Sequence, residues 1–330
     1  MAQVSRLTLA VEAGDLALPD AGQVAVFAPR GDTDLSALPK ERVQVITGHK
    51  PEFDRFSAQG FECSVEVQGP YAAAVVIVPR AKAQARSLLA EAEAATDGVI
   101  IVDGAKTDGV DSLLKAVRGR VPVWGPVNKA HGKLFWLKTG GHFADWAVQG
   151  RQEIAGGFVT APGVFSADGV DPASKFLADQ LPEKLGAVVG DLYAGWGYLS
   201  ARVLEREAVH TLHLVDADHA ALECAKANVT DMRAAFHWAD ATVWRAPEPV
   251  DTVVMNPPFH TGRAADPDLG RAFIAQAAAM LKPKGQLWMV ANRHLPYEVT
   301  LSERFGEVTE VAGDNRFKVL RATRPARKHR

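Results

Sequence analysis

The residues best suited to chemistry are Asn256-Pro257-Pro258-Phe259, which directly follow an apolar segment at residues 252–255. An amino group on guanine or adenine is a poor nucleophile, because its lone pair is delocalised into the ring. The Asn256 side-chain oxygen and the Pro257 backbone carbonyl can accept its two hydrogens and aim the nitrogen at an electrophile. The two prolines fix φ and so hold the carbonyls in direction, and Phe259 can stack on a base. The motif is typical of a site that activates a planar amine.

A second set of residues, Gly195, Gly197 and Asp216, is typical of a site for a nucleotide-like ligand. The glycines follow an apolar segment at 187–192, where they let the backbone approach a ligand closely at the start of a helix. Asp216 lies nineteen residues after Gly197, and a carboxylate there can accept both hydroxyls of a ribose. Because Gly195-x-Gly197-x-x-Ser200 also approximates the dinucleotide-binding fingerprint, this set alone leaves dinucleotide binding open.

The elements that must position these residues alternate between strand and helix. In the second half, apolar runs predict strands at 187–192, 211–215, 252–255 and 285–291, and helical periodicity predicts helices at 199–206, 220–229 and 271–281. Residues 313–315, between 307–311 and 316–321, predict a hairpin. Ligands bind at the carboxyl ends of strands in such sheets, which is where both sets of residues fall.

The first half shows the same alternation, with predicted strands at 24–27, 43–46, 74–78 and 99–102 and a predicted helix at 81–95. The length of 330 residues fits two domains, and the glycine-rich stretch at 140–163 is the predicted joint. We therefore predict domains at 1–150 and 151–330, each with a parallel sheet covered on both faces. The similar layouts suggest a duplication.

Composition sets the cellular context. The chain is 47% hydrophobic and 23% charged, with a net charge of −2, and it has no apolar run of about 18 residues, so no membrane span is expected. Its start does not resemble a secretory signal. Cys63 and Cys224 are far apart and lack metal spacing, which favours a reducing cytoplasm. After Asp314 the charges are all basic, which indicates either a phosphate-binding tail or a solvated terminus.

Taken together, the motifs resemble those of a known family. Asn-Pro-Pro-(Phe/Tyr) is the amino-methyltransferase motif of class I S-adenosylmethionine (AdoMet) enzymes, and the chain resembles the bacterial ribosomal RNA guanine-N2 methyltransferases of the small-subunit type. The matching blocks are residues 163–171, 256–262, 290–297 and 316–319. The resemblance covers most of 160–322 and is looser over 20–140, where 102–109 match best.

The resemblance implies two tandem Rossmann-like methyltransferase domains, the second with a seven-stranded class I sheet. It implies that the first is degenerate and non-catalytic, with a possible role in RNA binding or folding, and that the second binds AdoMet. It further implies a guanine N2 in ribosomal RNA of the small subunit as the methyl acceptor, a cytoplasmic monomer, and no metal or membrane. Carried over by position, the cofactor residues are Asp191, Gly195, Gly197, Asp216 and Asp240, the catalytic residues are Asn256, Pro257 and Phe259, and Phe165 and Ser166 lie near the methionine end.

One residue departs from the family pattern. Tyr193 stands where the family usually has glycine, and its side chain could crowd the methionine moiety. The interpretation as an inactive RNA-binding or assembly protein therefore stays open. The methyl acceptor could also be another amine, adenine N6 or the side chain of a protein glutamine. A nicotinamide-dependent oxidoreductase would leave residues 256–259 unexplained.

Two other groups of residues suggest sites of their own. His210, His213 and His219 could suggest a metal, but residues three apart on a strand face opposite sides, so core or surface histidines are favoured. Lysines around residues 134–137 could bind single-stranded RNA or be the solvated lysines of a strand.

Overall fold

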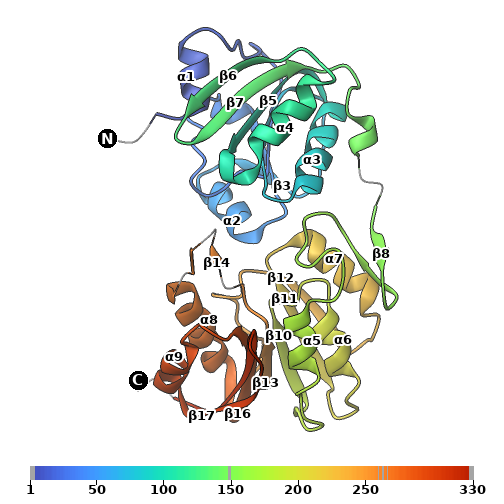
Figure 1. The fold of residues 1–330 in the computed structure, drawn as a ribbon, viewed down its shortest axis with the longest axis vertical. Helices are drawn as coiled ribbons and strands as arrows, with labels where there is room; N and C mark the ends of the chain where they lie inside the picture. The colour runs from blue at the N-terminus through green and yellow to red at the C-terminus, as the bar shows by residue number, and fades with distance from the viewer. Residues whose placement is uncertain (1–3, 148–149, 259, 262–263, 266, 327–330) are drawn as a thin grey trace. The chain divides into compact units, whose positions relative to one another are not determined.

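The computed structural model describes all residues except 1–3, 148–149, 259, 262–263, 266 and 327–330. The chain forms two compact units, Met1–Gly150 and Arg151–Arg330, called the first and the second unit below. Each unit contains a seven-stranded sheet with helices on both faces (Figure 1). The prediction of an α/β chain with two tandem Rossmann-like domains is confirmed.

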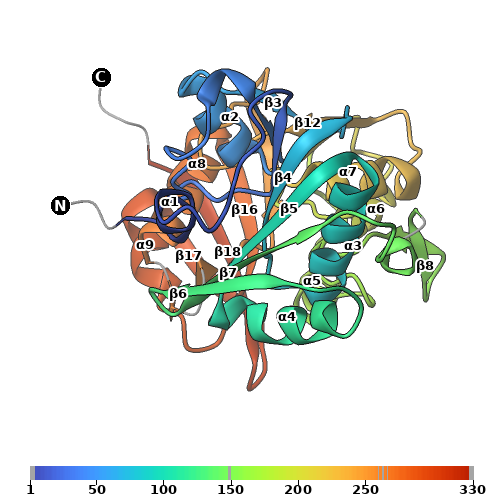
Figure 2. The ribbon, with the colours of Figure 1, turned by 90° about the horizontal axis from the view of Figure 1, so that it is seen from above.

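In the first unit the sheet order is β3-β2-β1-β4-β5-β7-β6. Its strands are β1 (Val24–Phe27), β2 (Val43–Ile46), β3 (Glu62–Ser64), β4 (Tyr71–Ile77), β5 (Thr96–Ala105), β6 (Trp124–Lys129) and β7 (Gly132–Lys138). Its helices are α1 (Arg6–Glu12), α2 (Lys50–Ala58), α3 (Lys82–Ala94) and α4 (Val110–Arg118). Buried residues of α1 and α2 pack on one face and those of α3 and α4 on the other. Figure 2 shows α1 and α4 on opposite faces.

In the second unit the order is β12-β11-β10-β13-β16-β18-β17. Its strands are β10 (Val188–Leu192), β11 (Thr211–Asp216), β12 (Ala234–Trp238), β13 (Val250–Met255), β16 (Leu281–Asn292), β17 (Phe305–Gly313) and β18 (Phe317–Pro325). Its helices are α5 (Pro172–Ala178), α6 (Tyr198–Leu204), α7 (His219–Asn228), α8 (Pro267–Met280) and α9 (Tyr297–Arg304). Two small hairpins pair β8 (Gln152–Ile154) with β9 (Phe158–Thr160) and β14 (His260–Thr261) with β15 (Ala264–Ala265).

The two large sheets have the same strand order, so each strand of one unit has a counterpart in the other. In both, five parallel strands are followed by an antiparallel hairpin, β6–β7 or β17–β18. The sequence predicted purely parallel sheets apart from the last hairpin, so the β6–β7 pair is a correction. β1 is apolar, and β10 is apolar apart from Gly190 and Asp191, because both strands lie in the middle of a sheet covered on both faces.

The predicted hairpin around residues 313–315 is confirmed, since β17 and β18 pair antiparallel on either side of it. The basic residues of β18 are therefore not a free tail: Lys318 is buried and its Nζ lies 2.6 Å from Glu298 Oε1. Arg324 pairs with Glu307 at 2.9 Å. Residues 327–330 lie outside the described residues. The lysine-flanked stretch 134–137 is a buried part of β7, and Lys133 pairs with Asp111 at 2.7 Å.

Candidate active site of the second unit

The turn after β10 is shaped by residues with positive φ. Tyr193, Gly195 and Gly197 have φ of 67°, 54° and 90°, a region that glycine adopts without steric cost. Gly197 caps α6, and a Cβ on it would lie 3.0 Å from Cγ2 of Val229. A Cβ on Gly195 would meet no atom within 4 Å. The backbone at Gly195 is therefore open to a ligand, whereas Gly197 is needed for close packing.

Asp216 ends β11 and holds this turn in place. Its Oδ2 accepts a hydrogen bond from the Gly195 N–H at 2.8 Å, and its Oδ1 accepts one from the Asp218 N–H at 2.8 Å. Desolvation raises the pKa of Asp216 to about 6, although both N–H bonds favour the carboxylate. Asp216 thus ties the ends of two neighbouring strands together at the edge where a ligand would lie.

Asp191 lies inside β10 with no exposed surface. Its Oδ2 accepts a bond of 2.6 Å from Ser200 Oγ, and no described residue hydrogen-bonds to its Oδ1. Burial raises the pKa of Asp191 to about 7. Asp191 supports the turn from beneath and carries an acceptor with unused bonding capacity.

Asn256 follows β13 directly and is held by two residues from the start of α5. Its Nδ2 donates to Asp171 Oδ2 at 2.9 Å and to Ser174 Oγ at 2.8 Å. A carboxylate can only accept hydrogen bonds, so the amide nitrogen must face Asp171 and the amide oxygen must face away from it. The orientation that amine binding requires is therefore built into the site.

A small cavity of about 20 Å³ joins Asn256 to the turn after β10. This juxtaposition brings together the two motifs that the sequence analysis placed at neighbouring strand ends. The cavity is lined by Phe165, Ser166, Asp171, Ser174, Tyr193, Ala194, Gly195, Trp196, Tyr198, Leu199 and Asn256.

The predicted site residues Asp191, Gly197, Asp216, Asp240 and Pro257 do not line this cavity. Pro257 is buried beside Asn256. Asp240 follows β12, and its Oδ1 accepts bonds from the N–H and the hydroxyl of Thr242 at 2.8 and 2.7 Å. Phe259 lies outside the described residues.

Tyr193 packs its ring against Phe273 of α8, with the ring centroids 4.6 Å apart. Burial raises the pKa of its phenol, and no described residue bonds to its hydroxyl. The ring is thus held in the apolar core between the sheet and α8. Its backbone N–H bonds Val215 O at 2.9 Å, which fixes the turn.

Asp171 and Ser174 were not assigned a role from the sequence, although Asp171 lies in one of the resembling blocks. The local signal was visible, since an Asp followed by a Pro is typical of a helix start. Asp171 does cap α5, accepting from the Ser174 N–H at 2.8 Å. Asp171 also accepts a hydrogen bond from the amide of Asn256, which lies 85 residues away in the sequence. Only the tertiary structure brings these two residues together.

Comparison with known proteins places the chain among methyltransferases. The family model described as Methyltransferase small domain matches residues 155–321. The Ribosomal RNA small subunit methyltransferase C of Shewanella oneidensis is 30% identical over 265 residues, which cover 76% of this chain and 77% of the relative. The chain belongs to the ribosomal RNA small subunit methyltransferase C family.

Further members agree with this assignment. The methyltransferase C of Shewanella amazonensis is 29% identical over 81% of this chain and 84% of its own length. A solved structure, the 16S rRNA N2 G1207 methyltransferase of T. thermophilus in complex with AdoMet and guanosine, is 26% identical with a TM-score of 0.79. It covers 93% of this chain and 90% of that one. The family predicted from the sequence is confirmed, and all of the cavity residues lie within the matched range 155–321.

Within the part of the chain that the structure describes, no group of His, Cys, Asp and Glu is arranged to hold a metal ion. His213 Nδ1 instead lies 3.0 Å from His237 Nε2. No helix of the described residues is long and apolar enough to cross a membrane.

Proposed function

We propose that the chain transfers a methyl group from AdoMet to the exocyclic N2 of a guanine in small-subunit ribosomal RNA, acting as a monomer in the cytoplasm. The observation that carries this proposal is the cavity shared by Asn256 and the turn after β10. The names of the relatives support the acceptor and the cofactor.

The residues of the turn fit AdoMet, which supplies an electrophilic methyl group on a sulfonium when bound. Gly195 leaves open space above the backbone, and Asp191 Oδ1 has no described partner. Asp216, at the end of β11, is the acceptor we assign to the ribose hydroxyls, and Asp240 is assigned to the adenine amino group. Two carboxylates that burial holds near neutral pKa also suit a cationic ligand, which favours their ionised form.

Asn256 and Pro257 would act on the acceptor by positioning. The Asn256 side-chain oxygen and the Pro257 carbonyl accept the two hydrogens of the guanine amine, and Phe259 is assigned to stack on the base. Asp171 and Ser174 prevent the amide from turning over. The amine need not lose a proton before attack, because its acidity rises as the new bond to carbon forms. Catalysis would come from orientation and charge stabilisation.

We assign catalysis to the second unit alone and treat the first as its degenerate copy. Phe27 pairs with Val76 as Leu192 pairs with Met255, so the residue after Val76, Ile77, stands in the place of Asn256. An isoleucine side chain cannot accept a hydrogen bond from an amine.

Substitution of Asn256 tests this function. We expect Asn256→Ala to lower methyl transfer by about a hundredfold or more, as removal of an oriented acceptor does, while AdoMet binding stays unchanged. Asp216→Ala should instead weaken AdoMet binding. Labelled AdoMet offered with ribosomal RNA, DNA and protein measures transfer and acceptor class, and calorimetry measures binding.

Asn128→Ala in β6 is the matched control, since Asn128 is exposed and its side chain donates a hydrogen bond to the nearby Pro126 carbonyl. Normal turnover by Asn256→Ala would contradict the proposed mechanism. Transfer to DNA or protein in preference to RNA would contradict the proposed acceptor.

A further inference from the structure

Tyr193, the residue that follows β10, has a backbone conformation that suits glycine. Its φ of 67° lies in the left-handed region, which a residue with a Cβ adopts only at a steric cost. Its counterpart in the first unit is Ala28, which follows β1 with a φ of 50°. The Ala28 N–H bonds Ile46 O at 2.8 Å, as the Tyr193 N–H bonds Val215 O at 2.9 Å. Because an alanine serves in the same turn, the fold does not require the tyrosine ring.

The hydroxyl of Tyr193 is buried and has no hydrogen-bond partner among the described residues. Burial raises the pKa of the phenol, and the charges of Asp240 and Asp216 raise it further. The hydroxyl therefore stays protonated and can donate a hydrogen bond. A buried donor without an acceptor lowers the stability of the free protein, so the side chain carries a second cost besides its φ. Such costs are typical of residues that serve a ligand.

The hydroxyl lies near the carboxyl ends of β11 and β12. The Asp216 carbonyl at the end of β11 accepts from the Ala239 N–H at 3.0 Å, which holds the turn with Asp240 beside it. Since the charges of Asp216 and Asp240 both act on the hydroxyl, it is close to the carboxylates assigned above to the ribose and to the adenine amino group. Neither carboxylate bonds to it. The oxygens of Asp216 accept from backbone N–H groups, and Asp240 Oδ1 accepts from Thr242.

An adenosine moiety requires hydrogen-bond partners of both kinds. Its amino group and ribose hydroxyls can donate to a carboxylate, but the adenine ring nitrogens N1, N3 and N7 can only accept. An ionised carboxylate cannot donate to a ring nitrogen, whereas a phenol hydroxyl can. The Tyr193 hydroxyl therefore supplies a donor that the side chains of Asp216 and Asp240 lack.

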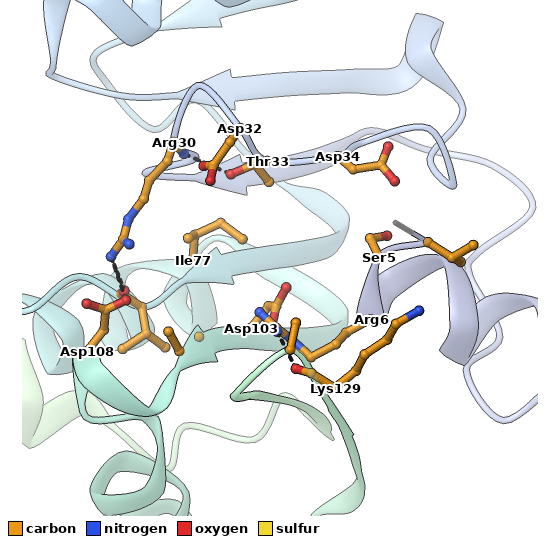
Figure 3. A pocket seen from close by; sticks show the side chains of 15 residues that line it. Ser5, Arg6, Arg30, Asp32, Thr33, Asp34, Ile77, Asp103, Asp108 and Lys129 are labelled. Carbon is orange, nitrogen blue, oxygen red and sulfur yellow. Dashed lines mark hydrogen bonds and ion pairs between the residues drawn. The ribbon is translucent and has the colours of Figure 1, made fainter. Parts of the chain in front are cut away.

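The corresponding edge of the first unit differs in this respect. A cavity of about 330 Å³ lies there, and Ile77 lines it in place of the catalytic amide. Figure 3 shows two ion pairs in this cavity, Arg6 with Asp103 at 2.5 Å and Arg30 with Asp108 at 2.8 Å. Among its buried and half-buried lining residues in the described part of the chain, none has a buried side-chain nitrogen or oxygen without a partner. The unpaired hydroxyl thus belongs to the unit to which we assign AdoMet.

We propose that the Tyr193 hydroxyl donates a hydrogen bond to a ring nitrogen of the adenine of AdoMet, so that Tyr193 is a specificity-determining residue for the cofactor. This role rests on the proposed function, because it takes AdoMet as the ligand of this edge. The ring packs against Phe273 with the ring centroids 4.6 Å apart, which holds the hydroxyl in place before the ligand binds. The tyrosine then adds a contact with the cofactor instead of obstructing it.

Tyr193→Phe tests this role, because it removes the hydroxyl and keeps the ring. In calorimetric titrations of the full chain, we expect it to weaken AdoMet binding about tenfold, the effect of one lost hydrogen bond. In urea unfolding without ligand, the same substitution should leave the free energy of unfolding unchanged or raise it, since an unpaired buried donor is lost. A purely structural role of the hydroxyl would instead lower stability and affinity together.

Tyr71→Phe in β4 of the first unit is the matched control. The Tyr71 hydroxyl is also buried but has partners, because it donates to Gln44 Oε1 and accepts from the Gln68 N–H at 3.0 Å. We expect this variant to lose stability in urea unfolding and to bind AdoMet as the unchanged chain does. The two substitutions should therefore show opposite patterns of stability and affinity.

Analogues of S-adenosylhomocysteine in which N1, N3 or N7 is replaced by C–H identify the accepting atom. One of the three should bind the unchanged chain about tenfold more weakly than S-adenosylhomocysteine does. Tyr193→Phe should not weaken the binding of that analogue further, because the two changes remove the same hydrogen bond. The other two analogues should lose affinity with Tyr193→Phe as S-adenosylhomocysteine does.

Equal binding of AdoMet by Tyr193→Phe and the unchanged chain would overturn this role and leave the proposed methyl transfer intact. A fall in stability together with affinity would also overturn it, as would an equal loss of affinity for all three analogues, because the hydroxyl would then contact no ring nitrogen. Absence of AdoMet binding by the unchanged chain up to about 10 mM would overturn the proposed function, and this role with it. The two failures are therefore distinguishable.

Discussion

At the scale of single residues, several buried polar groups of the second unit hold the residues of the site in position. Asp171 and Ser174 orient Asn256, Asp216 fixes Gly195, and Asp191 supports the turn through Ser200. The Asp171 carboxylate can only accept and the Gly195 N–H can only donate, so the orientations of Asn256 and of the Asp216–Gly195 bond are defined. The carboxylates of Asp191 and Asp216 lower the stability of the ligand-free protein when they are ionised, because burial removes water from their charge.

The pH dependence of stability should reveal this cost at Asp191. Its pKa is raised from 3.8 to about 7 in the folded protein, so the folded state binds the proton more tightly than the unfolded state. The contribution of Asp191 to stability is full below its unfolded pKa and declines until pH about 7. Asp191→Asn cannot ionise and should gain stability relative to the unchanged chain as pH rises, by at most about 4 kcal/mol.

Urea unfolding of both proteins between pH 4 and pH 8 measures the difference. Asp216 titrates in the same range in both proteins, so its contribution largely cancels. A stability difference that does not change with pH would show that Asp191 is not held near neutral pKa.

How far the site could be predicted from the sequence differs among its residues. Asn256, Gly195 and Asp216 could be predicted because each lies at or shortly after the end of a mostly apolar strand, at a characteristic spacing. The contact of Asp171 with Asn256 could not be found, because it joins a helix cap and a strand end that are 85 residues apart.

At the scale of elements, the central strands were predictable and the connections were less so. Strands β10, β11 and β13 are largely buried and mostly apolar, which made them visible in the sequence despite single polar residues such as Asp191 and Thr252. The stretch at 140–163 was predicted only as a glycine-rich joint, but it contains the β8–β9 hairpin. That hairpin is bound by Asn228 at the end of α7, whose role depends on the tertiary structure.

Asn228 joins the hairpin to the turn that lines the active-site cavity. Its Oδ1 accepts from the Val159 N–H at 2.7 Å, and its Nδ2 donates to the carbonyls of Val159 and Trp196 at 2.8 Å each. We expect Asn228→Ala to lower the free energy of unfolding by about 2–3 kcal/mol, because three hydrogen bonds are lost. AdoMet binding should weaken as well, since Trp196 lines the cavity.

Asn128→Ala is again the control, because one exposed hydrogen bond of a strand is lost. Its effect should stay within about 0.5 kcal/mol. Urea unfolding and calorimetric titration with AdoMet measure the two quantities. Equal destabilisation by both substitutions would mean that Asn228 does not fasten the hairpin.

At the scale of the whole molecule, both units have the same strand order. The net charge of the chain is −2, which is close to neutral. Affinity for RNA must therefore depend on where cations lie. In β18, Phe317 pairs with Asn292 at the carboxyl end of β16, and Thr323 pairs with Gln286 toward the opposite end. Arg316 thus lies at the same edge of the sheet as Asn256, and Arg324 lies at the other edge.

This placement predicts different effects of two similar substitutions on RNA binding. Arg316→Gln should weaken binding of a ribosomal RNA fragment and lower the slope of log affinity against log salt by about 0.7–0.9, which is one phosphate contact. Arg324→Gln should change neither quantity, because its pairing with Glu307 lies away from the site edge. Titrations at several salt concentrations measure both, and an equal response of the two variants would contradict the placement.

The matching strand order has a practical consequence for anyone who alters this protein. Ile77 corresponds to Asn256 and Ala28 to Tyr193. A substitution at one of these positions can therefore be compared with a substitution at its counterpart in the other unit. One unit thus serves as a control for the other. A substitution that acts through the backbone should have a similar effect in both units, whereas one that removes a reacting group should have an effect in the second unit alone.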